Sequence, residues 1–358
     1  MQEKEIEIAR ELRFVQFPHP GKEHGLPADK ARRVKSGTRN VVKEWSLLSY
    51  HKRKFMMAKG VAVDANHNVL GESNLYFWGE WEPMSYVTDH FPDGDGVRLP
   101  KFLHDPVLIL VKDGKPHDKK KKESDDEKVG GCQNTDPFVF GDNFLYSYCR
   151  QYIRYNKVED KKRDKTKPEK DVPTKLQHLQ KGSIIVFGST IGPRSANPMF
   201  VVDTVFVVGD MQPYRPINAR ADLSSYFASK TFLSDYMEIM QFPKILEKPV
   251  DGEWFSCYKG RTFADCPEGP FSFVPCKTEL PVVNDQRMGF ERPVIPLKEL
   301  DLRYKGEDLI KPMSYRNFSA YEILPQDAPQ LWNRVKEIIL SQGFSLGVHL
   351  EYEREIRP

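Results

Sequence analysis

The sequence has few cysteines, no long apolar run and no recognisable secretion signal. Its five cysteines are odd in number, widely spaced and free of any CxxC pair, which argues against a disulfide framework and a structural zinc ribbon. No apolar stretch approaches the roughly 18–20 residues that a membrane-spanning helix needs. Residues 1–13 are charged and lack the apolar centre of a signal peptide. We therefore expect a cytoplasmic protein without a membrane partner.

The chain also has almost no net charge. Its 54 basic and 51 acidic residues leave a formal charge of +3, whereas dedicated nucleic-acid binders usually show a basic excess. Net charge therefore gives no support to a nucleic-acid partner, although a local basic patch would suffice for one. No GxGxxG motif opens a predicted helix, and P-loop, HExxH and GxSxG motifs are absent.

Aromatic residues, in contrast, are plentiful. The 22 Phe and 15 Tyr residues provide ample material for an apolar core. Many short apolar or alternating segments mix with a few helical ones, so we predict an α+β fold. Its β-rich core is expected to hold a bent, partly closed, mixed or antiparallel sheet flanked by several helices.

The predicted elements rest on periodicity and on turn residues. Strands are predicted at residues 12–17, 60–64, 75–78, 200–208 and 346–352, with a hairpin turn at 64–71. Helices are predicted at residues 37–55, 219–240 and 327–342, the last with Asp327 as its N-cap and Gly343 after its end. Residues 255–293 are predicted to be mostly loop, with short strands such as 271–274.

Composition divides the chain into four parts. Residues 1–111 form an N-terminal α/β part, and residues 112–130 form a charged loop. Residues 131–210 are β-rich and are interrupted by a second charged loop at 157–175, and residues 211–358 form a C-terminal α+β part. The two loops are predicted to be solvated, although the lysines at 119–122 could contact phosphates. We expect the parts to interweave in one globule.

Two groups of basic residues are candidates for chemistry or anion binding. His19 and His24 lie in a loop after a predicted strand, where they could act as acid-base groups or metal ligands. The alternative is a pair of ordinary surface histidines. His51 and Lys54 would share one face of the predicted helix and could neutralise a phosphate. The alternative is the solvated end of that helix.

A cluster of tryptophans and carboxylates lies at residues 76–83. Trp78 and Trp81 offer flat aromatic faces, and Glu80 and Glu82 offer acceptors for the amino groups of a base. This combination suits a pocket in which a base or cation stacks, and the alternative is a corner of the core. Asp136, which precedes a proline, is a further candidate for catalysis, with a turn or cap residue as its alternative.

One segment shows a family resemblance. Residues 181–189, KGSIIVFGS, are followed by the apolar strand at 200–208, and this pair resembles the corresponding part of PUA-like domains of the EVE and ASCH type. The resemblance covers about residues 136–210. It implies a small, strongly bent β-barrel that holds a nucleobase, often a modified one, with Trp78, Trp81 and Ser189 as the first pocket candidates.

These patterns lead to a predicted function with two alternatives. The leading prediction is a protein that recognises a nucleotide or nucleic acid and reads a base by aromatic stacking. The first alternative is a hydrolase or transferase acting on a nucleotide or nucleic acid, in which His19 and His24 work with Glu80 or Asp136. The second is an interaction subunit whose aromatic residues face a protein partner. No cofactor is implied by the sequence.

Overall fold

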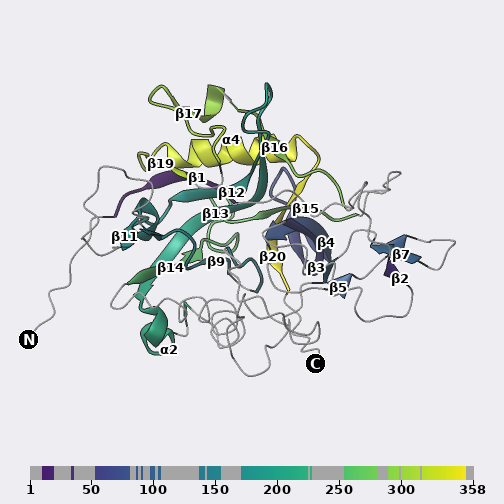
Figure 1. Ribbon diagram of the computed structural model, residues 1–358, viewed down its shortest axis with the longest axis horizontal. Coiled ribbons are helices and arrows are strands. Elements are labelled where there is room, and N and C mark those ends of the chain that lie inside the picture. Colours follow the sequence, from purple (N-terminus) through teal and green to yellow (C-terminus); the bar gives the residue numbers. More distant parts are fainter. Residues whose placement is uncertain are drawn as a thin grey trace, which may run out of the picture.

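The computed structural model describes the main body of the chain. It covers residues 10–19, 53–80, 137–141, 143–154, 171–224, 226–227, 254–279, 289–297, 300–314 and 317–351, and the backbone of five short strands between residues 34 and 105. Figure 1 shows the strands gathered into sheets, with one long helix across one side.

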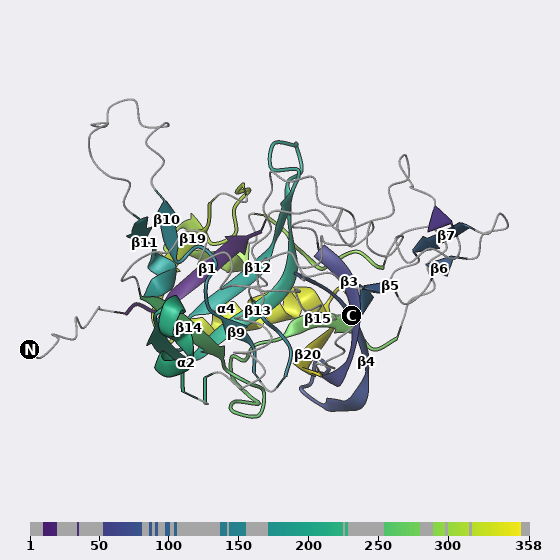
Figure 2. The same cartoon turned by 60° about the horizontal axis from the view of Figure 1, so that its bottom comes forward.

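A seven-stranded mixed sheet forms the centre. In sheet order its strands are β19 (Ser319–Glu322), β1 (Arg13–Pro18), β12 (Ile184–Ile191), β13 (Met199–Tyr214), β14 (Phe255–Gly260) and β9 (Leu145–Tyr146), and β16 (Val294–Ile295) also pairs with β13. β1 and β12 are parallel, and the other pairs are antiparallel. Figure 2 shows the β12–β13 hairpin extending beyond its neighbours.

Both faces of this sheet are buried, because its central strands are apolar on both sides. Phe17 and Phe187 belong to one core cluster, together with Phe77 of the second sheet. Phe14 and Val186 belong to the other cluster, which lies against the long helix. Two layers of apolar side chains therefore fix the central strands in place.

The second sheet is built on a long hairpin. In order its strands are β20 (Ser345–Leu350), β15 (Val274–Lys277), β4 (Val69–Glu80), β3 (Arg53–Val63), β8 (His104–Asp105) and β5 (Tyr86–Val87), and β20 also pairs with β3. The Asp64 carboxylate closes the β3–β4 turn by accepting hydrogen bonds from the backbone amides of Asn66 and Asn68 at 2.8 and 2.9 Å. This confirms the hairpin turn predicted at 64–71.

The remaining elements are small. The strand pairs are β10 (Tyr152–Arg154) with β11 (Asp171–Pro173), β17 (Arg303–Tyr304) with β18 (Glu307–Asp308), and β2 (Val34–Lys35) with β7 (Val97–Pro100), which also pairs with β6 (His90–Phe91). The 3₁₀ helices are η2 (Lys175–Gln177), η3 (Pro216–Asn218) and η5 (Leu300–Leu302).

Helix content is lower than predicted. The described residues contain two α-helices, α2 (Ala219–Asp222) and α4 (Ala328–Leu340), rather than several. The predicted helix 327–342 is confirmed by α4, whose apolar face includes Leu331 and Trp332 and packs on the central sheet. The indole Nε1 of Trp332 donates to the carbonyl oxygen of Phe271 at 2.9 Å and anchors the helix.

Three other predictions about elements need correction. At the start of the helix predicted at 219–240, a helix forms only over Ala219–Asp222, because the backbone of Leu223 is already extended; residues 228–240 lie outside the described part. The last three residues of the helix predicted at 37–55 belong to strand β3, and residues 37–52 lie outside the described part. The supposed loop 255–293 contains the strands β14 and β15, whose partners β13, β20 and β4 lie far away in sequence.

The strand predictions are better matched. β1, β13 and β20 overlap the strands predicted at 12–17, 200–208 and 346–352, and the predicted 60–64 and 75–78 lie almost wholly within β3 and β4. The division into four parts stays a prediction, and most of both charged loops lies outside the described residues. Within the described part of the chain, no helix has the length and apolar character to cross a membrane.

Candidate functional site

The strand pair β12–β13 carries a β-bulge at Asp203. Phe187 faces Thr204 across the ladder, but the next residue, Gly188, faces Val202, so Asp203 is an extra residue in β13. A bulge re-aims the side chains around it. Gly188 suits this place, since a Cβ there would lie 2.1 Å from a carbonyl oxygen of β13. The bulge therefore places a carboxylate in a largely apolar stretch of strand.

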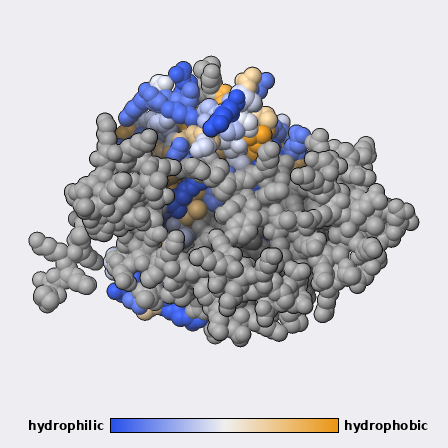
Figure 3. All heavy atoms as spheres, viewed as in Figure 1, coloured by the Kyte–Doolittle hydropathy of each residue, from blue (hydrophilic) through white to orange (hydrophobic). Residues whose placement is uncertain are grey.

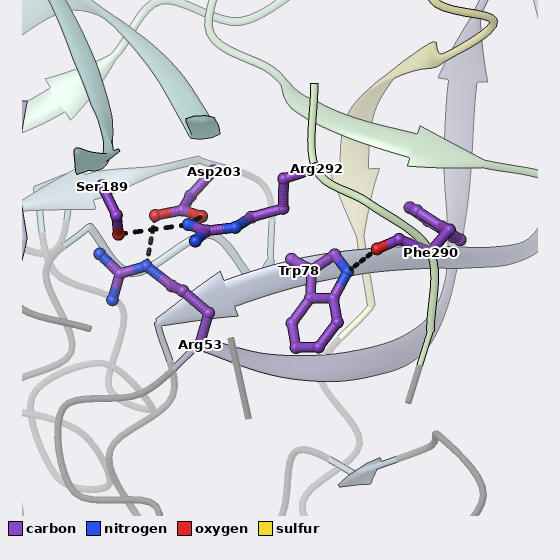
Figure 4. Close-up of polar contacts among 6 residues, drawn as sticks. All are labelled: Arg53, Trp78, Ser189, Asp203, Phe290 and Arg292. Carbon is purple, nitrogen blue, oxygen red and sulfur yellow. Dashed lines mark hydrogen bonds and ion pairs between the residues drawn. The ribbon is translucent and has the colours of Figure 1, made fainter. Parts of the chain in front are cut away.

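Two arginine side chains hold the Asp203 carboxylate (Figure 4). Arg53, the first residue of β3, donates from Nε to Oδ2. Arg292, just before β16, donates from Nη1 to Oδ1 at 2.5 Å and also to Oγ of Ser189 at 3.3 Å. The three charged side chains are at most 3% exposed. We call Arg53, Ser189, Asp203 and Arg292 the arginine cluster.

Burial of the charged side chains of the arginine cluster carries a large desolvation cost. Removing charges from water costs several kcal/mol per ion, and apolar residues of similar volume are often equally stabilising or better. Within the cluster two guanidinium groups face the Asp203 carboxylate. Because of this desolvation cost, we take the arginine cluster as the candidate site.

A small cavity adjoins the cluster. Its wall includes the rings of Phe77 and Phe187, and its polar lining comes from Arg53, Asp203 and Thr204. The rest of the lining consists of Gly79, Pro137, Val139 and Val274. The enclosed space has room for about one water-sized group. The site can therefore surround a single polar group with donors and acceptors at its polar side and apolar walls elsewhere.

His19 lies near the same cavity. Its backbone amide donates to the carbonyl oxygen of Gly188 at 2.7 Å, which extends the parallel pairing of β1 and β12 by one residue. Its ring stacks on Phe17 at 4.9 Å and lies 6.2 Å from the ring of Phe187, a cavity residue. The side chain is 4% exposed. His19 is therefore not the ordinary surface histidine that the sequence left open as an alternative. A role for it in chemistry stays a prediction.

Trp78 lies in strand β4 between the cavity residues Phe77 and Gly79, and it is packed in the core. Its ring is 5.2 Å from that of Phe55, and its Nε1 donates to the carbonyl oxygen of Phe290 at 2.5 Å (Figure 4). The indole is 2% exposed. Trp78 therefore occupies a core position, which was the alternative left open by the sequence. Base stacking on Trp78 stays a prediction.

Lys54 is fully buried in strand β3, next to Arg53. Its predicted position at a solvated helix end is therefore wrong, because the strand begins at Arg53 and carries Lys54 into the sheet. Its predicted partner His51 lies outside the described residues.

The structure describes the other predicted site residues only in part. His24, Trp81, Glu82 and Asp136 lie outside the described residues. For Glu80 the backbone alone is described, as the last residue of β4 and the ladder partner of Arg53. Glu80 and Asp136 are each adjacent in sequence to a cavity residue, Gly79 and Pro137 respectively. The structure thus places the backbones of Trp78 and Glu80 on either side of the cavity residue Gly79.

The central residues of the cluster were not among the predicted site residues. Asp203 had a visible signal, because it interrupts an otherwise apolar strand. Arg53 stood in the basic run HKRK, where a solvated role was the simpler interpretation. Arg292 had no local signal, since its position in a proline-containing loop gives no indication of burial.

Metal-binding groups and known relatives add no further information about this site. Within the described ranges, no group of three or more His, Cys, Asp and Glu side chains is placed to hold a metal ion. No family model, no curated protein and no solved structure matches this chain.

Proposed function

We propose that this protein recognises a nucleobase, carried by a nucleotide or a nucleic acid, at the cavity beside the arginine cluster. One observation supports this most: Arg53 and Asp203, held by their ion pair, line the cavity together with apolar residues that include Phe77 and Phe187. Ligand sites combine apolar walls with a few fixed polar groups in this way.

The chemistry of a base fits such a site. Bases have apolar faces that pack against aromatic rings, and their edges carry carbonyl oxygens and amino groups. Arginine donates to carbonyl and ring-nitrogen acceptors, and a carboxylate accepts from an amino group. Because the enclosed space holds about one water-sized group, we propose that one polar substituent of the base enters it while the ring stays at the mouth.

We also propose that residues 136–210 contribute to a PUA-like barrel in a cytoplasmic protein. The course of β13 supports the barrel. This strand pairs with β12 in its first part and with β14 in its last part, and its ladder shifts register at Asp203 and again between Val208 and Asp210. Bulges increase the twist of a strand and help a sheet to curve.

The enzymatic alternative has weaker support from the geometry. Hydrolysis or group transfer needs an activated nucleophile or a metal-bound water. The described residues of the site offer donors, a carboxylate held by two arginines and a stacked histidine. Recognition requires only the arrangement that is present.

Isothermal titration calorimetry with the 5′-monophosphates of guanosine, adenosine, cytidine and uridine tests the proposal. Val274→Ile adds one methylene group to the cavity wall, and Val205→Ile is the matched control at a buried strand position that does not line the cavity. We expect at least one nucleotide to bind the native protein. We expect Val274→Ile to weaken that binding at least tenfold and Val205→Ile to leave it within about twofold.

Thermal unfolding separates blocked binding from lost folding. Overpacking a filled core costs about 1–3 kcal/mol, and the cavity should reduce this cost at Val274. A native protein that binds none of the four nucleotides would contradict the proposal. Equal affinities for the native protein and a folded Val274→Ile variant would contradict the proposed location.

A further inference from the structure

A lysine and a histidine from distant parts of the chain meet beside α4. The amine nitrogen Nζ of Lys336, on α4, lies 2.7 Å from Nε2 of His67 in the turn between β3 and β4. In Figure 3, described residues of both hydrophilic and hydrophobic character share the upper surface, where α4 lies in Figure 1. The contact ties the turn of the second sheet to the helix that packs on the central sheet.

Two aromatic rings flank this pair. Nζ of Lys336 lies 5.0 Å from the ring centroid of Trp332, about one helical turn earlier on α4. The imidazole of His67 is roughly perpendicular to the rings of Phe271 and Trp332, with centroids 5.7 and 6.3 Å away. Lys336 is 8% exposed and His67 is half-buried. Water therefore screens charges on the pair only in part.

The backbone of the turn holds the imidazole in position. His67 has a φ of +61°, in the left-handed region, and its amide donates to the carbonyl oxygen of Asp64 at 3.1 Å. The Asp64 carboxylate accepts from the amides of Asn66 and Asn68, on either side of His67. Histidine is one of the residue types that are enriched in this conformation. The turn therefore directs a ring nitrogen of His67 at Lys336.

Three carboxylates of the described residues also act on the pair. Burial lowers the pKa of Lys336 and outweighs the exposed Glu337 of α4 and Glu268 of the loop before β15, which favour its charged form. Asp64 favours a charge on His67, but its carboxylate is directed at amides of its own turn, and those hydrogen bonds are the main cause of its lowered pKa. The direct contact at 2.7 Å is therefore the strongest influence on the charge of the pair.

The contact is favourable with one positive charge and unfavourable with two. A hydrogen bond between two nitrogen atoms needs a donor and an acceptor, which an ammonium and a neutral imidazole provide. An imidazolium has only donors, so it would face the Lys336 ammonium as a like charge. Two unit charges this close repel each other strongly where water screens them poorly. Imidazole side chains change charge between about pH 5 and 8, so the contact is sensitive to moderate acid.

We propose that His67 and Lys336 form a pH-sensitive latch. At neutral pH the Lys336 ammonium donates to the neutral imidazole and holds the β3–β4 turn against α4. In moderate acid the imidazole gains a proton, the two cations repel each other, and the turn separates from the helix. Val63, the last residue of β3, stays packed in the same apolar cluster as Trp332, so the movement is confined to the turn. The latch does not depend on base recognition at the cavity.

Urea unfolding of a double-mutant cycle tests the latch. His67→Asn removes the imidazole but suits the left-handed backbone, and Lys336→Met removes the charge but keeps an unbranched side chain. We expect the coupling between the two positions to raise the urea midpoint at about pH 8 and to lower it at about pH 5. Lys277→Met is the matched control, because Lys277 lies 4.7 Å from the ring of Phe344 and donates to the carbonyl oxygen of Gly343 at 2.9 Å. Its cycle with His67→Asn should show no coupling at either pH.

Nuclear magnetic resonance of the native protein with labelled aromatic rings follows the movement of the turn. We expect cross-relaxation between the rings of His67 and Phe271 at about pH 8 and its loss at about pH 5. The rings of Phe271 and Trp332, 4.8 Å apart, should stay in contact at both values. A coupling of the same sign at both pH values, or none at either, would overturn the latch. A His67–Phe271 contact that persists in acid would also overturn it, as would loss of both ring contacts together, which means acid unfolding.

Discussion

Replacing Asp203 with asparagine tests the energetic basis of the arginine cluster. The substitution keeps the shape of the side chain but removes the one carboxylate between Arg53 and Arg292. Because the three side chains are at most 3% exposed, solvent screens the remaining charges poorly. We expect the free energy of unfolding to fall by about 3–5 kcal/mol, the range for breaking a buried ion pair.

A surface ion pair provides the comparison. Arg303 and Asp308 are 3.0 Å apart, with side chains 45% and 32% exposed. Exposed pairs contribute about 0–1 kcal/mol because water screens them and because ordering two side chains costs entropy. Asp308→Asn should therefore lower the free energy of unfolding by no more than about 1 kcal/mol.

A triple variant distinguishes a structural role from a functional one. Arg53→Met, Asp203→Leu and Arg292→Met together replace the charged groups with apolar side chains of similar size. Such replacements of buried ion networks are often neutral or stabilising. We expect the triple variant to regain most of the stability that Asp203→Asn loses but to lose nucleotide binding.

Urea unfolding followed by tryptophan fluorescence and circular dichroism measures these differences, with a check that the urea slope is unchanged. Calorimetric titration measures binding. If Asp203→Asn lowers the free energy of unfolding by less than about 1 kcal/mol, the buried arginines do not need the carboxylate as a partner, and the energetic reasoning is wrong. If the triple variant is as unstable as Asp203→Asn, the cluster is required for folding and its cost is no argument for a ligand.

Three further predictions concern single positions. Gly188→Ala should lower the free energy of unfolding by more than about 2 kcal/mol, since its Cβ would lie 2.1 Å from a backbone oxygen, and a urea midpoint equal to that of the native protein would contradict this. Burial lowers the pKa of Lys336, so its charge destabilises the fold below that pKa, and the penalty fades as pH rises toward the unfolded value of about 10.4. Lys336→Met should therefore be more stable at pH 7, with a smaller gain at pH 10; a less stable variant would refute this. Burial raises the pKa of the Cys276 thiol to about 12, so iodoacetamide at pH 8 should modify the half-buried Cys266 before Cys276, as mass spectrometry of the native protein can show.

Local signals made part of the fold predictable. Helix α4 combines apolar spacing, a proline in the first turn and Gly343, whose φ of +76° ends it. The hairpin turn after β3 depends on Asp64 and its neighbours, all within five residues. Each of these features is determined by residues close together in sequence, and such features are the ones confirmed.

Long-range contacts decided the cases that failed. The segment after Asp222 has helical spacing, but its first residues instead meet Gln212 of β13. Lys54 stands in a basic run that is typical of a solvated helix end, yet the run enters the sheet through pairing of β3 with β4. In both places the local pattern was compatible with a helix, and tertiary pairing overrode it.

Long-range contacts also limited the prediction of the functional site. Asp203 was visible as a charge within an apolar strand, and burial of a charge requires a partner. A cation must therefore lie near Asp203 in the fold, but 150 residues separate Asp203 from Arg53 and 89 separate it from Arg292. Many lysines and arginines in the sequence could supply this cation, and only the packing of the two sheets brings Arg53 and Arg292 to Asp203. A charge in an apolar strand is thus evidence for a site, whereas the identity of its partners has to come from the fold.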